Sequence, residues 1–215
     1  MSKIILFQGD SITDCGRSRD AGNEHAGYGY AQFTKGALGA EYPGEYTFFN
    51  RGVSGNRIVD IYARIKADII NLKPDYMSLL IGINDIWHEI SNKNGVGPEK
   101  FEMIYDMLIS EVKAALPDIK IMLLGAFVLE GSATCNTDEV PDRLLRFKKG
   151  AELNAAAANR IAKKHGLLYV PLQEVFDKAC EKAEPAYWTA DGVHPTPMGH
   201  ELIKKEWLKA FMRVK

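Results

Sequence analysis

The 215-residue chain contains little cysteine. Its three cysteines, Cys15, Cys135 and Cys180, are odd in number and form no C-x-x-C pair. Disulfide frameworks use paired cysteines, and zinc ribbons use closely spaced ones. We therefore expect neither disulfides nor a metal site. We interpret Cys15, four residues after Ser11, as a small half-buried thiol rather than a nucleophile.

The sequence also lacks long apolar runs and an excess of either charge. No run approaches the ~18 residues of a membrane-spanning helix, and the apolar run near Met1 is too short for a secretory signal. The formal net charge is −1, which argues against nucleic acid as a partner. These absences predict a cytoplasmic protein without membrane attachment, whose partner is a small molecule.

Hydrophobic residues make up 46% of the chain, enough to bury a sizeable core. The length favours a single domain spanning residues 1–215. Short apolar runs alternate with segments of helical periodicity. Strands are expected at residues 3–8, 45–50, 75–82, 119–127 and 167–171, and helices at residues 28–42, 58–72, 101–116, 143–165, 175–182 and 197–212. Five short strands separated by helices predict a parallel sheet covered on both faces, an α/β/α sandwich.

The first expected strand runs directly into Gly9-Asp10-Ser11. Three interpretations are open: a helix cap, a phosphate-binding loop or a catalytic nucleophile. Neither G-x-x-x-x-G-K-[ST] nor G-x-G-x-x-G follows this strand, so the phosphate loop is disfavoured. Asp10 or Ser11 could cap the next turn. Ligand sites in parallel sheets form beyond the carboxyl ends of the strands, which keeps Ser11 a candidate nucleophile.

A serine nucleophile needs a base, and the base needs an orienting group. The stretch "DGVHP" supplies Asp191 and His194, three residues apart and hence on the same side of a helix-like turn. A surface Asp–His pair in a loop is the alternative. His200 is a second candidate base, but no acid precedes it by three residues. No catalytic role is assigned to the remaining histidines, His25, His88 and His165.

Acyl transfer also needs hydrogen-bond donors where negative charge develops. Gly52, in "NRGVSGN", can bring its N–H close to a ligand because it has no side chain. Asn84, in "GIND", carries an amide on a short stem. A loop glycine and a turn asparagine are the alternatives. A long loop at residues 125–141 follows the fourth strand, and loops of this length are often functional.

Taken in order, "GDSITD", "NRGVSGN", "GIND" and "DGVHP" resemble the SGNH (GDSL) hydrolase family over residues 9–195. The resemblance implies a five-stranded, flavodoxin-like α/β/α fold and no cofactor. It also implies Ser11 as nucleophile, Asp191 as acid and His194 as base. The implied oxyanion donors are the Ser11 N–H, the Gly52 N–H and the Asn84 side chain. "GDSITDCGR", "GINDIW" and the tryptophan before "DGVHP" are most similar to bacterial acetylxylan esterases.

The predicted function is that of a serine esterase acting on short acyl esters, with O-acetyl groups on a carbohydrate such as a xylo-oligosaccharide as the favoured substrate. Arg57 and Trp188 are candidate substrate-binding residues, and so is Asp10, which could instead cap its turn or touch the Asn84 loop. Trp87 and Tyr187 belong either to a sugar-stacking wall or to the core. The alternatives are a general short-chain esterase or lysophospholipase-like hydrolase, and a catalytically silent carbohydrate- or nucleotide-binding module of the same fold.

Overall fold

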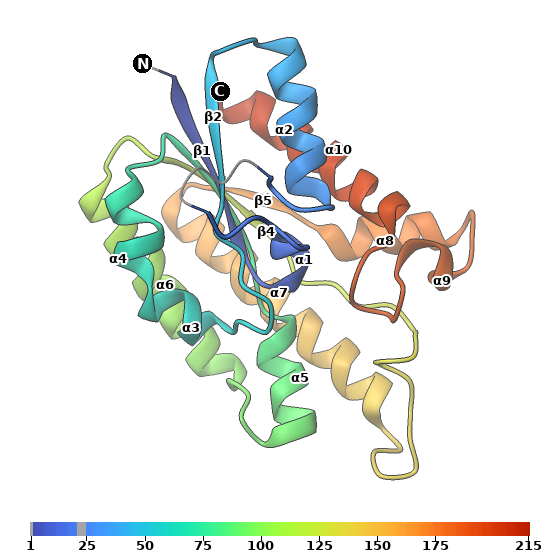
Figure 1. The fold of residues 1–215 in the computed structure, drawn as a ribbon. Coiled ribbons are helices and arrows are strands. Elements are labelled where there is room, and N and C mark those ends of the chain that lie inside the picture. The colour runs from blue at the N-terminus through green and yellow to red at the C-terminus, as the bar shows by residue number, and fades with distance from the viewer. Residues whose placement is uncertain (1, 21–24) are drawn as a thin grey trace.

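A five-stranded sheet forms the centre of the computed structural model, which describes residues 2–20 and 25–215 (Figure 1). Its strands are β1 (Lys3–Gly9), β2 (Tyr46–Asn50), β3 (Tyr76–Leu80), β4 (Lys120–Leu124) and β5 (Leu168–Val170). All neighbouring strands pair in parallel. Their order is β2-β1-β3-β4-β5, which is the flavodoxin-like order. The structure therefore confirms the predicted α/β class.

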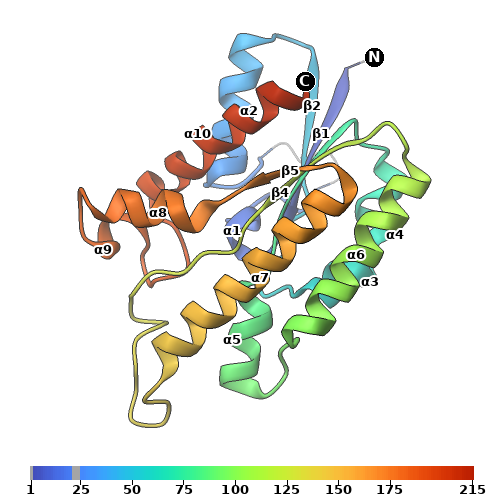
Figure 2. The same cartoon turned by 180° about the vertical axis from the view of Figure 1, so that it is seen from behind.

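Helices cover both faces of the sheet, as Figures 1 and 2 show from opposite sides. One face carries α2 (Tyr30–Glu41), α8 (Leu172–Cys180) and α10 (Pro197–Val214). The other carries α3 (Ile58–Ala63), α4 (Ile65–Asp68), α6 (Pro98–Ala115) and most of α7 (Arg143–His165). The sheet is therefore the middle layer of three.

Each face of the sheet has its own hydrophobic core. Every strand contributes side chains to both cores, because successive side chains point to opposite faces. In β1, Ile5 and Phe7 join the core under α10, whereas Leu6 joins the core under α3 and α6. The Phe7 and Trp207 rings lie 5.3 Å apart between their centroids, and both side chains are fully buried. Truncating such a buried aromatic side chain to alanine typically costs about 3–5 kcal/mol.

The apolar spacing over residues 58–72 predicted one helix, and this prediction is wrong in part. The structure has α3, then α4, then a 3₁₀ turn at Ile70–Leu72. The break falls at Arg64, whose guanidinium donates to Asn56 Oδ1 at 2.9 Å and to the Arg51 carbonyl at 3.1 Å. The buried isoleucine stripe is present as predicted, because it includes Ile58, Ile61, Ile65 and Ile69.

Three helices near the carboxyl ends of the strands were not predicted: α1 (Ser11–Asp14), α5 (Ile83–Asn92) and α9 (Pro185–Trp188). α5 begins directly after β3, at a Gly82 whose φ of 129° favours glycine. The 125–141 segment contains no helix or strand, as expected of a loop, and β4 ends at Leu124 rather than at the predicted residue 127. Within the described part of the chain, no helix is both long and apolar enough to cross a membrane.

Candidate active site

Ser11 lies where β1 ends. A Cβ on Gly9 would lie 2.4 Å from the Leu80 carbonyl oxygen, so only glycine fits this close approach between β1 and β3. Asp10 then caps α1, since its Oδ1 accepts the Ile12 N–H at 3.0 Å. Ser11 is the first residue of α1 and is half-buried. The strand and the cap together fix the position of the hydroxyl.

Ser11, His194 and Asp191 form a continuous series of hydrogen bonds. The Asp191 Oδ2 lies 2.7 Å from His194 Nδ1, and His194 Nε2 lies 2.9 Å from Ser11 Oγ. The other Asp191 oxygen accepts the N–H groups of Val193 at 2.9 Å and His194 at 2.8 Å. With its Nδ1–H donating to Asp191, His194 has Nε2 available to accept the proton of Ser11.

The surroundings of Asp191 and His194 lower the pKa of the carboxyl group and raise the pKa of the imidazole. Burial alone would raise the pKa of Asp191, but hydrogen bonds from the His194 side chain and from two backbone N–H groups outweigh it and lower the pKa to about 2. The hydrogen bond with Asp191 raises the pKa of His194 above its ordinary 6.5, against the opposing effect of burial. An ionised Asp191 therefore stabilises a protonated His194.

A pocket of about 240 Å³ opens beside Ser11 and His194. Its other lining residues are Ser54, Gly55, Asn84, Trp87, His88, Ser91 and Asn92. Most of them are small or polar. Among the described residues, no group of three or more His, Cys, Asp or Glu side chains is placed to hold a metal ion.

The prediction for Gly52 is wrong, because the Gly52 N–H already donates to Asn50 Oδ1 at 2.9 Å. A Cβ at Gly52 would lie 2.4 Å from the Asp14 nitrogen, so this residue packs against the backbone of α1. The glycine that lines the pocket is Gly55, whose φ is 81°. Both glycines occur in "NRGVSGN", and the sequence alone does not show which of their N–H groups faces the pocket.

Asn84 lies at the pocket, as predicted. It is the second residue of α5, and it is only 6% exposed. One amide N–H donates to the Asn56 carbonyl at 3.2 Å, and a primary amide has a second N–H to offer. Asn84 therefore links the 51–57 loop to α5 and lines the pocket at the same time.

Two of the candidate substrate-binding residues have other partners. Asp10 is 1% exposed, and its carboxylate caps α1 rather than facing the pocket. Arg57 pairs with Asp60 through Nε at 2.9 Å and Nη2 at 3.1 Å. Its Nη1 donates to the Asn94 carbonyl at 2.6 Å. Neither residue lines the pocket, so Asp10 is corrected to a helix cap, whereas a substrate contact for the half-buried Arg57 stays a prediction.

The aromatic candidates divide between the pocket and its surroundings. Trp188 donates its indole N–H to the Ala183 carbonyl at 3.2 Å, packs against the core and does not line the pocket, so its contact with substrate stays a prediction. Tyr187 packs edge-on against Trp188 and is exposed. Trp87 does line the pocket, with its ring centroid 5.9 Å from that of His194.

His200 is ruled out as the base by its contacts. Its Nδ1 accepts the Tyr30 N–H at 3.1 Å, and its Nε2 lies 3.5 Å from Cys15 Sγ. Burial, with the nearby charge of His194, lowers the pKa of His200 to about 4. Cys15 is half-buried, as predicted, and burial raises the pKa of its thiol.

Sequence reasoning missed five pocket residues: Ser54, Gly55, His88, Ser91 and Asn92. A signal was present for two of them, His88 and Ser91. Asn84, Trp87, His88 and Ser91 recur at the spacing i, i+3, i+4 and i+7, which is one face of a helix. The spacing is hard to detect because "GIND" follows a strand directly and also fits a turn.

The 125–141 loop holds the turn that carries Asp191 and His194. The Leu129 N–H donates to the Gly192 carbonyl at 2.8 Å, and the Ala133 N–H donates to the Asp191 carbonyl at 2.9 Å. A Cβ on Gly131 would lie 2.3 Å from the Asp191 carbonyl carbon, so the two backbones meet closely. The 125–141 loop therefore helps to hold Asp191 and His194 in position.

A serine hydroxyl, an imidazole and a carboxylate bonded in this order at the carboxyl edge of a parallel sheet form the arrangement of a serine hydrolase. The model of the GDSL-like Lipase/Acylhydrolase family matches residues 7–202. The chain belongs to this family, and it is a carboxylic ester hydrolase.

Relatives of known name agree with this class. An acetylxylan esterase from Geobacillus stearothermophilus is 33% identical over 214 residues, which cover 95% of this chain and 92% of that enzyme. The crystal structure of the acetylxylan esterase Axe2 from the same organism matches with a TM-score of 0.82 and 32% identity, covering 97% of this chain and 93% of Axe2. LAE5, an α/β hydrolase from the metagenome of Lake Arreo, matches with a TM-score of 0.85 and 30% identity, covering 100% of this chain and 98% of LAE5.

Proposed function

We propose that this esterase removes short acyl groups, above all acetyl, from carbohydrate esters through an acyl-enzyme. The observation that supports this most directly is the bonded series from Ser11 through His194 to Asp191, at one wall of a pocket that also contains Gly55 and Asn84. A nucleophile, a base, an orienting acid and two further donors thus meet in one small space.

In the proposed mechanism, Ser11 Oγ attacks the ester carbonyl while His194 Nε2 takes its proton, and Asp191 stabilises the imidazolium. The N–H groups of Ser11 and Gly55 and the Asn84 amide donate to the oxyanion. The ester C–O bond then breaks, and His194 protonates the leaving alcohol. Water, deprotonated by His194, attacks the acyl-enzyme, and the acid and free Ser11 are released.

The size and lining of the pocket favour a small acyl group. Its volume of about 240 Å³ lies below the roughly 300–1,000 Å³ of sites for drug-sized ligands. The polar side chains of Asn84, His88, Ser91 and Asn92 suit the hydroxyls of a sugar alcohol, and the Trp87 ring offers a stacking surface. The relatives named as acetylxylan esterases support an acetylated xylo-oligosaccharide as the substrate class.

The test compares acyl chain length and leaving alcohol in one panel. The kcat/KM for p-nitrophenyl esters should fall steeply from acetate to octanoate, because a pocket lined mostly by small or polar residues offers little apolar surface to the longer chain. Acetylated xylo-oligosaccharides should release acetate with a kcat/KM at least equal to that of p-nitrophenyl acetate. A flat or rising chain-length series supports the lysophospholipase-like alternative, since each buried methylene can contribute up to ~0.8 kcal/mol.

A further inference from the structure

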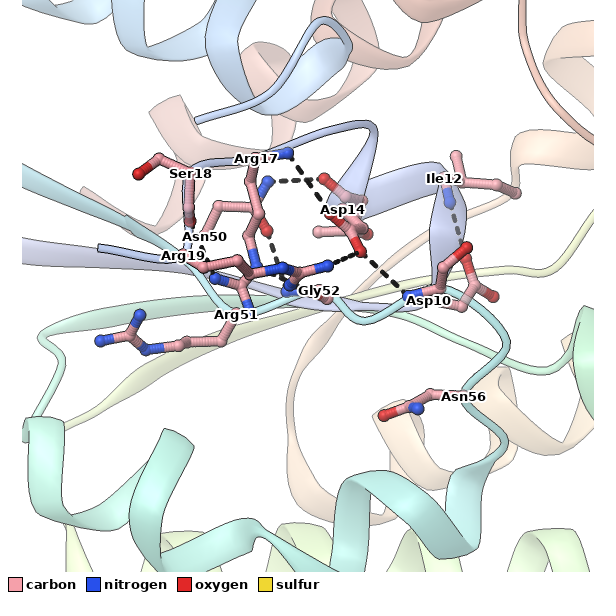
Figure 3. A network of polar contacts seen from close by, with 12 residues as sticks. Asp10, Ile12, Asp14, Arg17, Ser18, Arg19, Asn50, Arg51, Gly52 and Asn56 are labelled. Atoms are coloured by element: carbon pink, nitrogen blue, oxygen red, sulfur yellow. Dashed lines mark hydrogen bonds and ion pairs between the residues drawn. The ribbon is translucent and has the colours of Figure 1, made fainter. Parts of the chain in front are cut away.

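Asp14 connects the turn of the candidate nucleophile to the loop of the candidate oxyanion glycine. It is the last residue of α1, three residues after Ser11, and it is 3% exposed. Its Oδ2 accepts the Ser54 N–H at 3.0 Å and pairs with Arg19 Nη2 at 2.5 Å, and its Oδ1 accepts the Arg17 N–H at 3.3 Å (Figure 3). One buried carboxylate thus joins α1 to both flanking segments.

Arginines reinforce this connection from the solvent side. Arg17 Nε donates to the Gly52 carbonyl at 2.7 Å, and Arg19 Nη1 donates to the same oxygen at 3.3 Å. Figure 3 shows Arg17 and Arg19 beside Gly52, on the far side of Asp14 from Asp10, whereas the Arg51 side chain points away from Gly52. Arg19 therefore contacts both the Asp14 carboxylate and the loop that this carboxylate holds.

The connection matters because the two backbone donors come from different segments. The Ser11 N–H belongs to α1, whereas the Gly55 N–H belongs to the loop after β2. An oxyanion hole works only when its donors point to a single position in advance of the reaction. Ser54 directly precedes Gly55, so the hydrogen bond from its N–H to Asp14 fixes the chain one residue before the donor.

We infer that Asp14, paired with Arg19, is a positioning residue that sets the distance between the Ser11 and Gly55 donors. This inference rests on the proposed function. The carboxylate lies behind the pocket and contacts no pocket group except the Ser54 backbone, so it acts through the loop. Displacement of the loop weakens binding of the charged oxyanion more than binding of the neutral ester, and the loss therefore falls on kcat rather than KM.

Asp14→Ala should lower kcat for p-nitrophenyl acetate at least roughly tenfold, with KM changed less than about threefold, because a 1 Å misplacement can cost up to ~10²-fold. The affinity for phenylboronic acid, which forms a charged tetrahedral adduct with a serine hydroxyl, should fall in parallel with kcat. Asp14→Asn keeps an oxygen that can accept the Ser54 N–H and should recover part of the loss. Arg19→Gln leaves the carboxylate in place and should give an intermediate loss.

Asp106→Asn is the matched control. Asp106 pairs with Lys164 and His165, both at 2.7 Å, and none of the three lines the pocket. This variant should lower the melting temperature while keeping kcat and boronate affinity. If Asp14→Ala fails to fold, Asp14→Asn and Arg19→Gln make the same comparison.

The outcomes distinguish this inference from the proposed function. The proposed function stands if wild-type protein hydrolyses acetate esters. The inference is then overturned if Asp14→Ala keeps wild-type kcat and boronate affinity, or if Asp14→Asn and Arg19→Gln both keep them. The inference is also overturned if Asp14→Ala lowers only the melting temperature. If wild-type protein neither hydrolyses acetate esters nor binds the boronate, the proposed function fails and the inference fails with it.

Discussion

At the scale of single residues, two histidines near α1 have opposite roles. His194 contacts Ser11, whereas His200 contacts Tyr30 and Cys15. His194→Ala should lower kcat by at least roughly 10³-fold, because triad members act as a unit. His200→Ala should keep kcat within a few-fold and lower the melting temperature, since the Tyr30 N–H loses its partner. Kinetics and melting curves on both variants are the measurement, and the reverse pattern would refute the pairing of His194 with Asp191.

The pH profile provides a second residue-scale prediction. In the proposed mechanism, His194 acts as a base only when neutral, and its hydrogen bond with Asp191 raises its pKa above 6.5. Therefore kcat/KM should rise with pH through an acid limb whose midpoint lies above 6.5, and activity should be lost below it. The Asp10 charge also raises the His194 pKa, but burial raises the pKa of Asp10 itself to about 7, so Asp10 is only partly ionised in this pH range and Asp10→Asn should move the midpoint only slightly to lower pH. An acid limb at or below pH 6.5 in the wild type would contradict this account.

Some candidate residues could be placed at the site from the sequence and others could not. Ser11, Asp191, His194 and Asn84 each follow a strand or a turn at the carboxyl edge, where a parallel sheet places its sites. Gly52 and Gly55 have the same chemistry, and only the fold determines which N–H faces the pocket. The polar groups of Arg57 and Trp188 form hydrogen bonds with nearby residues, Asp60 and Ala183, and the sequence does not predict these partners.

At the scale of elements, α5 builds one wall of the pocket. It presents Asn84, Trp87, His88 and Ser91 on one face. Sequence patterns predicted the strands before this edge well, because continuous apolar runs are strong signals for buried strands. They missed α5 because it starts within two residues of β3, without an intervening loop to mark the change of periodicity.

Asn84 tests whether α5 takes part in the chemistry. If its amide donates to the oxyanion, Asn84→Ala should lower kcat by roughly 10²–10³-fold with little change in KM. The lost hydrogen bond to the Asn56 carbonyl should lower stability as well, by about 1 kcal/mol. Steady-state kinetics with a thermal melt separates the two effects. Wild-type kcat with a lowered melting temperature would leave Asn84 a purely structural residue.

At the scale of the whole molecule, the site depends on strand order. The order β2-β1-β3-β4-β5 brings the ends of β1, β2 and β3 side by side at one edge. Ser11, Gly55 and Asn84 follow these three adjacent strands, and the loop after β4 supports the turn with Asp191 and His194. The number and type of strands could be predicted from apolar periodicity. The contacts between distant loops could not, because they depend on three-dimensional packing.

The central claim is that Ser11 is the nucleophile of an esterase, and covalent labelling tests it most directly. Wild-type protein is incubated with a p-nitrophenyl organophosphonate, its intact mass is measured, and the modified peptide is sequenced. The account predicts one adduct, located on Ser11, with loss of ester hydrolysis in proportion to labelling. Ser11→Ala should remain folded, unlabelled and inactive. Labelling elsewhere, or hydrolysis by Ser11→Ala within tenfold of wild type, would contradict the claim, since loss of a triad nucleophile typically costs far more.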